Sequence, residues 1–393
     1  MFLATAPPSA LRASGGRIWL PISSGAAPWH RWFSTSPTHR AKHIITFGET
    51  SSPELSRLLD SFRHYIVLPT YLAGEQRKKI YNPKLKDILQ NDPVTMEIDG
   101  VAYKFRYINR VTELPNTRKI VTQAVNAMTT SKDFQNIPPL LEGCERANRT
   151  LGTPIRSSMI RRAAMHRSLH IIMDCVKAVK RTGFKLDHSE LINELLIWLQ
   201  LPAVQSGWDE AKTKVALKQV QLVLNLIESD ENHLPRKESQ GAFPFYRDPQ
   251  VLAARLHMAA ARAVHHQGGK DVDGKVTKYA QELVALWPEG AGLLDLQPDE
   301  SYRDKEKMSY LIERNHYLWY ASPVLNGLTL AAQVVDPGLA MQLQNRADSV
   351  ETEVKAALAS EKRKPGGRGE MIYNSLFNPQ ANEEELAAAE ETA

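Results

Sequence analysis

The chain lacks several features that mark particular classes of protein. Its 393 residues include only two cysteines, Cys144 and Cys175, which is too few for a disulfide framework and predicts two buried free thiols. No run of eighteen or more uncharged apolar residues occurs, so the sequence predicts no membrane insertion. The hydrophobic content of 42% and the charged content of 24% are ordinary for a folded globular protein.

Motifs for catalysis and cofactor binding are also absent. The sequence has no Gly-x-x-x-x-Gly-Lys-Ser/Thr phosphate loop, no strand-linked Gly-x-Gly-x-x-Gly, no Gly-x-Ser-x-Gly elbow and no Cys-x-x-Cys pair. His166, His170 and Asp174 share one predicted helix face, but a third ligand two turns away reaches a common metal poorly. We therefore predict a polar face with His170 partly buried, no metal or cofactor, and no enzymatic activity. A matrix enzyme without a recognisable motif stays an alternative.

Acidic residues are missing from the first 47 positions. That segment contains five basic residues, which account for the whole net charge of +5, and the rest of the chain has 44 basic and 44 acidic residues. Its composition is typical of a mitochondrial transit peptide, and Arg31-Trp32-Phe33-Ser34 resembles a matrix-peptidase site. We predict a transit peptide over residues 1–33, disorder to about residue 47 and a mitochondrial matrix location. An ordinary basic tail is the alternative.

A helix-pair pattern occurs three times between Arg118 and about Ser229. Arg118–Gly152 and Thr153–Asp187 align in blocks of 35 residues, a common length for solenoid repeats. Ile120 then matches Ile155, and Leu141 matches Val176. A third unit begins at His188 with a helix over Ser189–Trp198 and continues with another over Asp209–Glu228. The pattern predicts a mainly α fold, a helical-hairpin repeat of the α-solenoid type, over residues 117–229.

The flanking regions complete the predicted organisation. Residues 48–116 should form a helix and one small β-hairpin near residues 94–107, where strands alternate around Asp99-Gly100, and should cap the repeats. Residues 230–247 are interpreted as a linker, 248–361 as a C-terminal helical region, and 362–393 as a flexible tail that is first basic and then acidic. Within the C-terminal region we expect separate helices over Ser301–Tyr320 and Pro323–Val335.

The end of the second unit carries a family resemblance. Gly183-Phe184-Lys185-Leu186-Asp187 resembles the repeat-ending Gly-Ile-Lys-Pro-Asp of pentatricopeptide repeats, with Leu in place of Pro. The resemblance implies an organellar RNA-binding protein whose repeats can each read one base. The positions that correspond to the base-reading pair of each repeat are Thr122 with Gly152, Ser157 with Asp187, and Ile192 with no assigned partner. Because only Ser157 and Asp187 are both polar, RNA contact should be directed at the backbone.

Positive charge is concentrated within the repeats. Residues 142–185 hold ten basic and three acidic residues, and each cation that neutralises a phosphate adds affinity through counterion release. We predict that these ten basic residues contact the RNA backbone. Reversing the charges of Arg156, Arg161 and Arg162 should then weaken association with RNA without unfolding the repeats. A solvated helix face is the alternative. The ten residues are Arg146, Arg149, Arg156, Arg161, Arg162, Arg167, Lys177, Lys180, Arg181 and Lys185.

A second basic segment precedes the hairpin. Gly74–Asn91 interleaves its cations with Tyr81, and such a segment can follow a phosphate backbone; a solvated loop and short helix is the alternative. The cations are Arg77, Lys78, Lys79, Lys84 and Lys86.

Together these features favour a structural component of a mitochondrial ribonucleoprotein. We expect a lineage-specific, fungal-type mitochondrial ribosomal protein, of the small subunit rather than the large. Its partners would be RNA, mitochondrial rRNA first and mRNA second, and other mitochondrial ribosomal proteins. A freestanding RNA maturation or translation factor is the main alternative.

Overall fold

The computed structural model describes residues 44–98, 100–234, 241–360 and 366–378. The predicted mainly α fold with one small β-hairpin is confirmed, because the described chain is mainly helical and contains one two-stranded sheet. The predicted transit peptide, residues 1–33, lies outside the described residues. Disorder to residue 47 is a wrong prediction for Ile44 and Ile45, which are buried. The Ile45 amide donates a hydrogen bond to the Tyr71 hydroxyl at 3.0 Å.

The first helix, α1 (Pro53–Phe62), begins where its sequence predicts. The hydroxyl of Ser52 accepts a hydrogen bond from the Leu55 amide at 3.2 Å, and Pro53 occupies the first turn, where its missing N–H costs nothing. Leu55, Leu59 and Phe62 form the buried stripe of this helix.

The hairpin packs on a small core at the N-terminal side of the repeats. Strands β1 (Val94–Ile98) and β2 (Val101–Phe105) pair antiparallel, with Ile98 opposite Val101, which confirms the predicted hairpin. Beside it lie α2 (Gly74–Ile80) and α3 (Lys86–Asn91). The core beneath them consists of Ile44, Leu68, Leu72, Ile80, Phe105 and Ile108.

The first two predicted repeats are present as paired helices, with the second helix of each pair divided into two. The first division follows from Pro138 and Pro139, which lack the N–H groups needed to continue α5 into α6. Thr130 caps α5, and Asp133, at the third position of this helix, completes a capping box with it. The elements are α4 (Thr117–Ala127), α5 (Ser131–Phe134), α6 (Ile137–Arg146), α7 (Thr153–Met165), α8 (Leu169–Lys177) and α9 (Val179–Thr182).

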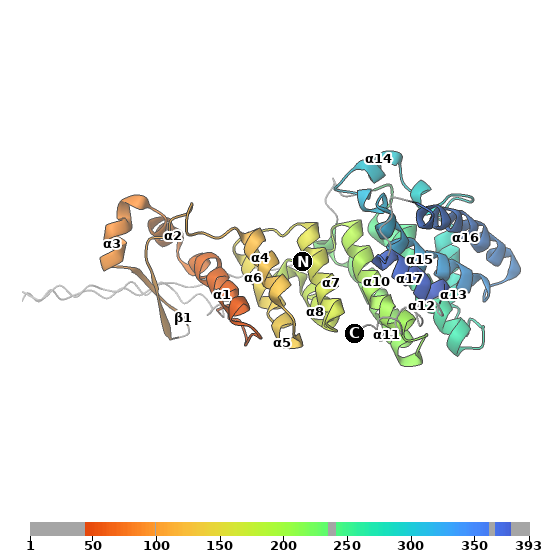
Figure 1. The fold of residues 1–393 in the computed structure, drawn as a ribbon, viewed down its shortest axis with the longest axis horizontal. Helices are drawn as coiled ribbons and strands as arrows, with labels where there is room; N and C mark the ends of the chain where they lie inside the picture. Colours follow the sequence, from red (N-terminus) through yellow and green to blue (C-terminus); the bar gives the residue numbers. More distant parts are fainter. Residues whose placement is uncertain (1–43, 99, 235–240, 361–365, 379–393) are drawn as a thin grey trace, which may run out of the picture. The chain divides into compact units, whose positions relative to one another are not determined.

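The third unit is longer than predicted. It consists of α10 (Ser189–Gln205) and α11 (Glu210–Ser229), and α10 continues past Trp198 through Pro202. Figure 1 shows α4, α6, α7, α8, α10 and α11 following one another as neighbouring helices, an arrangement compatible with a helical-hairpin solenoid.

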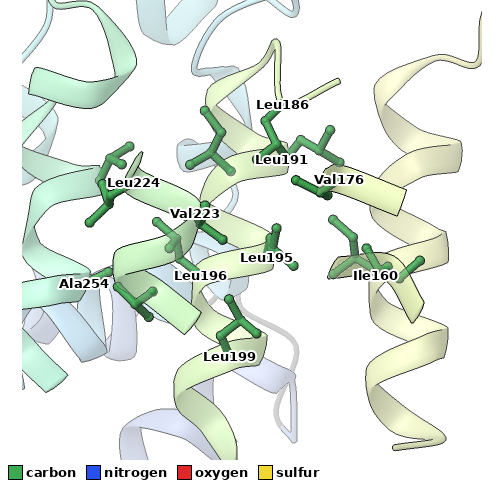
Figure 2. Packing of buried hydrophobic residues seen from close by; sticks show 14 of the residues in the cluster. Ile160, Val176, Leu186, Leu191, Leu195, Leu196, Leu199, Val223, Leu224 and Ala254 are labelled. Carbon is green, nitrogen blue, oxygen red and sulfur yellow. The ribbon is translucent and has the colours of Figure 1, made fainter. Parts of the chain in front are cut away.

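One hydrophobic core joins the repeats to the C-terminal helices. Figure 2 shows side chains from α7, α8, α10, α11 and α12 interdigitating. Of the aligned repeat positions, Ile120, Leu141 and Val176 are buried and Ile155 is partly buried against the same core. The side chains labelled in this view are Ile160, Val176, Leu186, Leu191, Leu195, Leu196, Leu199, Val223, Leu224 and Ala254.

The C-terminal region differs from the sequence prediction around Pro323. Instead of two helices meeting there, one helix runs from Arg314 to Ala332 through the proline. An internal proline costs about 3 kcal/mol, but this helix is buried along most of its length by its neighbours, so packing outweighs the lost hydrogen bond. The region contains α12 (Pro249–His266), α13 (Lys275–Val284), α14 (Asp299–Arg303), α15 (Arg314–Ala332) and α16 (Pro337–Leu358).

Part of the predicted flexible tail is a packed helix, α17 (Arg368–Phe377). Ile372 on this helix is 2% exposed. A Cβ added at Gly369 would overlap the Asn315 carbonyl oxygen and lie 2.7 Å from the Cβ of Leu318. The tail prediction is therefore wrong for residues 368–377, because glycine lets this backbone approach α15 closely.

The two cysteine thiols should be unreactive in the native protein. Both are buried, and burial raises the pKa of each thiol to about 12. Because the thiolate is the reactive form, we expect alkylation at pH 8 to be slower by roughly a thousandfold than in the unfolded chain. Iodoacetamide labelling followed by mass spectrometry, with and without urea, measures this ratio. Native labelling near the unfolded rate would contradict the burial.

Candidate nucleic-acid interface

The ten basic residues predicted to contact RNA do not form a single exposed set. Arg156 is 6% exposed. Arg146, Arg161 and Arg162 are half-buried. The six exposed members are Arg149, Arg167, Lys177, Lys180, Arg181 and Lys185.

Arg156 is part of a buried ion pair within the second repeat. Its Nη1 lies 2.7 Å from Oδ1 of Asp187 and donates to the Lys185 carbonyl at 2.5 Å. Both side chains are less than a tenth exposed. The pair links α7 to the segment that follows α9, so Arg156 is used by the fold and is inaccessible to a phosphate.

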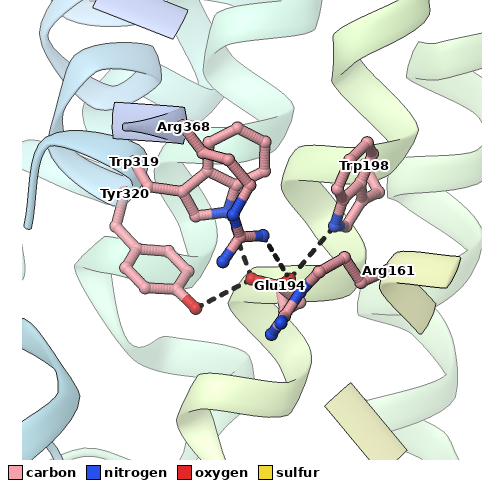
Figure 3. A network of polar contacts seen from close by, with 6 residues as sticks. All are labelled: Arg161, Glu194, Trp198, Trp319, Tyr320 and Arg368. Carbon is pink, nitrogen blue, oxygen red and sulfur yellow. Dashed lines mark hydrogen bonds and ion pairs between the residues drawn. The ribbon is translucent and has the colours of Figure 1, made fainter. Parts of the chain in front are cut away.

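Arg161 belongs to a polar network centred on Glu194 of α10 (Figure 3). The Glu194 side chain is only 3% exposed. One carboxylate oxygen accepts from Arg161 Nε at 3.4 Å, Trp198 Nε1 at 3.1 Å and Arg368 Nη1 at 3.1 Å. The other accepts from Trp319 Nε1 and the Tyr320 hydroxyl, each at 3.1 Å. The network therefore joins α7, α10, α15 and α17.

The charge state of Glu194 follows from these partners. Burial alone would raise its pKa, but the charge of Arg368, the hydrogen bond from Trp198 and the charge of Arg161 together hold the pKa below its ordinary value. The carboxylate is therefore ionised and fully surrounded by donors. Sequence reasoning missed this network, although Glu194 and Trp198 lie one helical turn apart, because Arg368 and Trp319 come from distant segments.

The other half-buried arginines are also bound within the chain. Arg162 donates to the carbonyls of Asn126 at 2.7 Å and Met128 at 3.1 Å, which ties α7 to the end of α4. Arg146 lies over the Tyr71 ring at 3.7 Å from its centroid. We therefore expect reversal of Arg156, Arg161 and Arg162 to disturb the repeats, in contrast to the tolerance expected from the sequence.

Two of the exposed cations form ion pairs, Lys177 with an exposed carboxylate and Arg181 with a partly buried one. Lys177 Nζ lies 3.1 Å from the Asp174 carboxylate, and Arg181 Nη1 lies 2.7 Å from Glu142. Such pairs at a surface contribute at most about 1 kcal/mol, so both cations can exchange partners readily. Together with Arg149, Arg167, Lys180 and Lys185 they form what we call the exposed basic set.

Three of the positions carried over from the base-reading resemblance are buried and therefore not available to a base. Ser157 and Asp187 are 2% and 5% exposed, and Ile192 is fully buried in the core. The hydroxyl of Thr122 donates to the Arg118 carbonyl at 2.8 Å.

The candidate metal ligands do not converge. His170 and Asp174 are exposed, so the prediction of a partly buried His170 is wrong. The ring of His166 packs against Phe134, with 5.2 Å between centroids. Within the described ranges, no three side chains of His, Cys, Asp or Glu are grouped closely enough to hold a metal ion.

Comparison with known proteins identifies the family. A family model described as mitochondrial ribosomal protein mS27 matches residues 31–375. The chain belongs to the mS27 family. It is 41% identical over 390 residues to the small ribosomal subunit protein mS27 of Neurospora crassa, covering 94% of this chain and 98% of that relative. In this mS27-family chain, the residues that match the family model include the repeats, the C-terminal helices and nearly all of α17.

Proposed function

We propose that this mS27-family chain is a structural, non-enzymatic component of the small subunit of the mitochondrial ribosome in the matrix. The observation that carries the proposal is the 41% identity to a small-subunit protein over nearly the whole length of both chains. The architecture supports it, because buried networks such as that of Glu194 make a firm helical support. In the described residues, no helix has the length and apolar character that crossing a bilayer requires.

The exposed basic set supplies the proposed contacts with ribosomal RNA. Its members lie in loops and helix ends, Arg149 at the end of the first repeat and the other five in the second repeat. Their charges can neutralise phosphates without reading sequence, which agrees with the burial of Ser157 and Asp187. The helical surfaces around it would hold neighbouring ribosomal proteins.

Sedimentation tests the proposed function directly. A tagged chain in a mitochondrial lysate should migrate with the small ribosomal subunit on a sucrose gradient at moderate salt. Exclusive recovery in light fractions would refute a ribosomal role and favour a freestanding RNA factor.

Neutralising part of the exposed basic set should weaken RNA binding electrostatically. We expect replacement of Lys180, Arg181 and Lys185 by Gln to lower the slope of log Kd against log salt by about two, since each lost phosphate contact removes roughly 0.7–0.9. Titration of rRNA transcripts at several KCl concentrations measures the slope. The matched control replaces Lys214 and Lys218 by Gln, two exposed cations on α11, and should leave it unchanged. An equal effect in both variants would remove the assignment.

A further inference from the structure

A surface hollow of about 590 Å³ lies between two loops, one leading into α4 and one joining α6 to α7. Both loops are polar, and each contributes an arginine. All of the lining residues are neutral or basic: Leu114, Pro115, Asn116, Thr117, Arg118, Asn148, Arg149 and Thr150.

The walls of the hollow are held in place by backbone hydrogen bonds. Asn148 has a left-handed backbone, with a φ of 53°, and the Arg149 amide donates to the Cys144 carbonyl at 2.8 Å. On the opposite wall, Oδ1 of Asn116 accepts from the Lys119 amide at 3.1 Å. The loop backbones are thus fixed, while the side chains of Arg118 and Arg149 remain exposed.

A third segment brings further arginines to the same place. The guanidinium of Arg110 lies over the Tyr81 ring, 4.5 Å from its centroid, and the Ile108 amide donates to the Ile80 carbonyl at 2.8 Å, which holds this segment against α2. Burial raises the pKa of Tyr81, and the charges of Arg110, Arg77 and Arg149 oppose that rise. The guanidinium of Arg110 thus lies over the ring, and the positive charges of Arg77 and Arg149, from two other segments, act on the tyrosine hydroxyl.

We propose that this hollow binds phosphate groups of an RNA backbone through Arg118 and Arg149 of its lining, together with Arg110 from the turn that ends at Leu114. The inference deepens the proposed function and rests on it. The planar guanidinium forks suit phosphate oxygens bidentately. An RNA occupant is favoured over a protein because the lining contains two arginines, no acidic residue and none of the aromatic side chains that are enriched in protein interfaces.

The site extends RNA contact beyond the second repeat. Of its three arginines, only Arg149 belongs to the exposed basic set. Arg110 and Arg118 lie within residues 104–119, a stretch with five basic residues and one acidic residue, and the fold brings this stretch beside Arg149.

Salt-dependent RNA binding tests the proposal on the purified mature chain. The probes are a labelled single-stranded RNA of about 20 nucleotides and a labelled RNA duplex of about 16 base pairs. Replacing Arg110 and Arg149 by Gln should weaken binding roughly tenfold at 0.1 M KCl and lower the salt slope by about 1.5, as expected for two lost phosphate contacts. Replacement of both by Lys should preserve the slope while weakening the affinity, because Lys keeps the charge and loses the fork.

The controls separate the possible outcomes. The Lys214→Gln, Lys218→Gln chain should keep the wild-type slope, and thermal melting should show that all variants are folded. An unchanged salt slope in the Arg110→Gln, Arg149→Gln chain overturns the proposal. If that chain keeps its salt slope but no longer associates with the ribosomal subunit, the proposal is also overturned, because the hollow then binds a protein. If the wild-type chain misses the subunit but the slope still falls, the proposed function fails and the phosphate site stands.

Discussion

Replacing Glu194 by Ala should lower the free energy of unfolding by about 3–5 kcal/mol. The change removes the carboxylate that accepts hydrogen bonds from five donors, and it leaves Arg161 and Arg368 without their negative partner. Removing one partner of a buried ion pair typically lowers the free energy of unfolding by this amount. Urea denaturation followed by the fluorescence of Trp198 and Trp319 measures the loss. Glu228→Ala, an exposed site on α11, is the control and should change stability by less than about 0.5 kcal/mol.

Acid should reproduce part of this effect. Since the folded-state pKa of Glu194 lies below its ordinary value of 4.5, the network contributes stability that is fully present above that value and lost as pH falls through the folded pKa. The Glu194→Ala chain should therefore show a weaker loss of stability below pH 4.5 than wild type. If the stability of wild type and of Glu194→Ala falls in parallel below pH 4.5, the network contributes little. A destabilisation of Glu194→Ala below about 1 kcal/mol would show the same.

Replacing Asp187 by Ala should have a comparable effect on the second repeat. The change leaves Arg156 buried beside a neutral side chain, and we expect a loss of about 3–5 kcal/mol. The double replacement Arg156→Met, Asp187→Leu should recover much of it, because apolar side chains of similar size can substitute for a buried ion pair. Denaturant unfolding of wild type, Asp187→Ala and the double variant measures both the loss and the recovery.

An exposed pair provides the contrast for Asp187. Asp174 also forms an ion pair, with Lys177, but both side chains are about half exposed or more. Asp174→Ala should therefore cost less than about 1 kcal/mol. Equal losses from Asp174→Ala and Asp187→Ala would contradict the distinction between surface and interior charge in this repeat.

Local signals in the sequence were sufficient where the chemistry is local. Ser52-Pro53, Asp248-Pro249 and Asp336-Pro337 each begin a helix, and such starts can be identified in the sequence because a cap and a first-turn proline act within one turn. The strand alternation around Asp99-Gly100 likewise gave the correct register of the hairpin.

Features that depend on distant partners could not be predicted in this way. Pro323 lies inside α15 because α12, α16 and α17 pack around it, and no short window contains those helices. The basic stretch 142–185 could not be divided into structural and exposed cations, because the partners of Arg156 and Arg161 follow 31 and 33 residues later. Composition therefore indicated a charged region but could not identify which of its residues are accessible.

The position of α17 also bears on how the chain completes its fold. Arg368 lies 174 residues after Glu194, so a chain that enters a compartment with its N-terminus first brings α7, α10 and α15 together before their last cation arrives. Until then the Glu194 carboxylate has lost water without its full set of donors, and burying it is unfavourable. The helices around Glu194 should therefore pack together completely only after the C-terminal segment with Arg368 has arrived. Folding of this part of the chain is then one of the last folding steps.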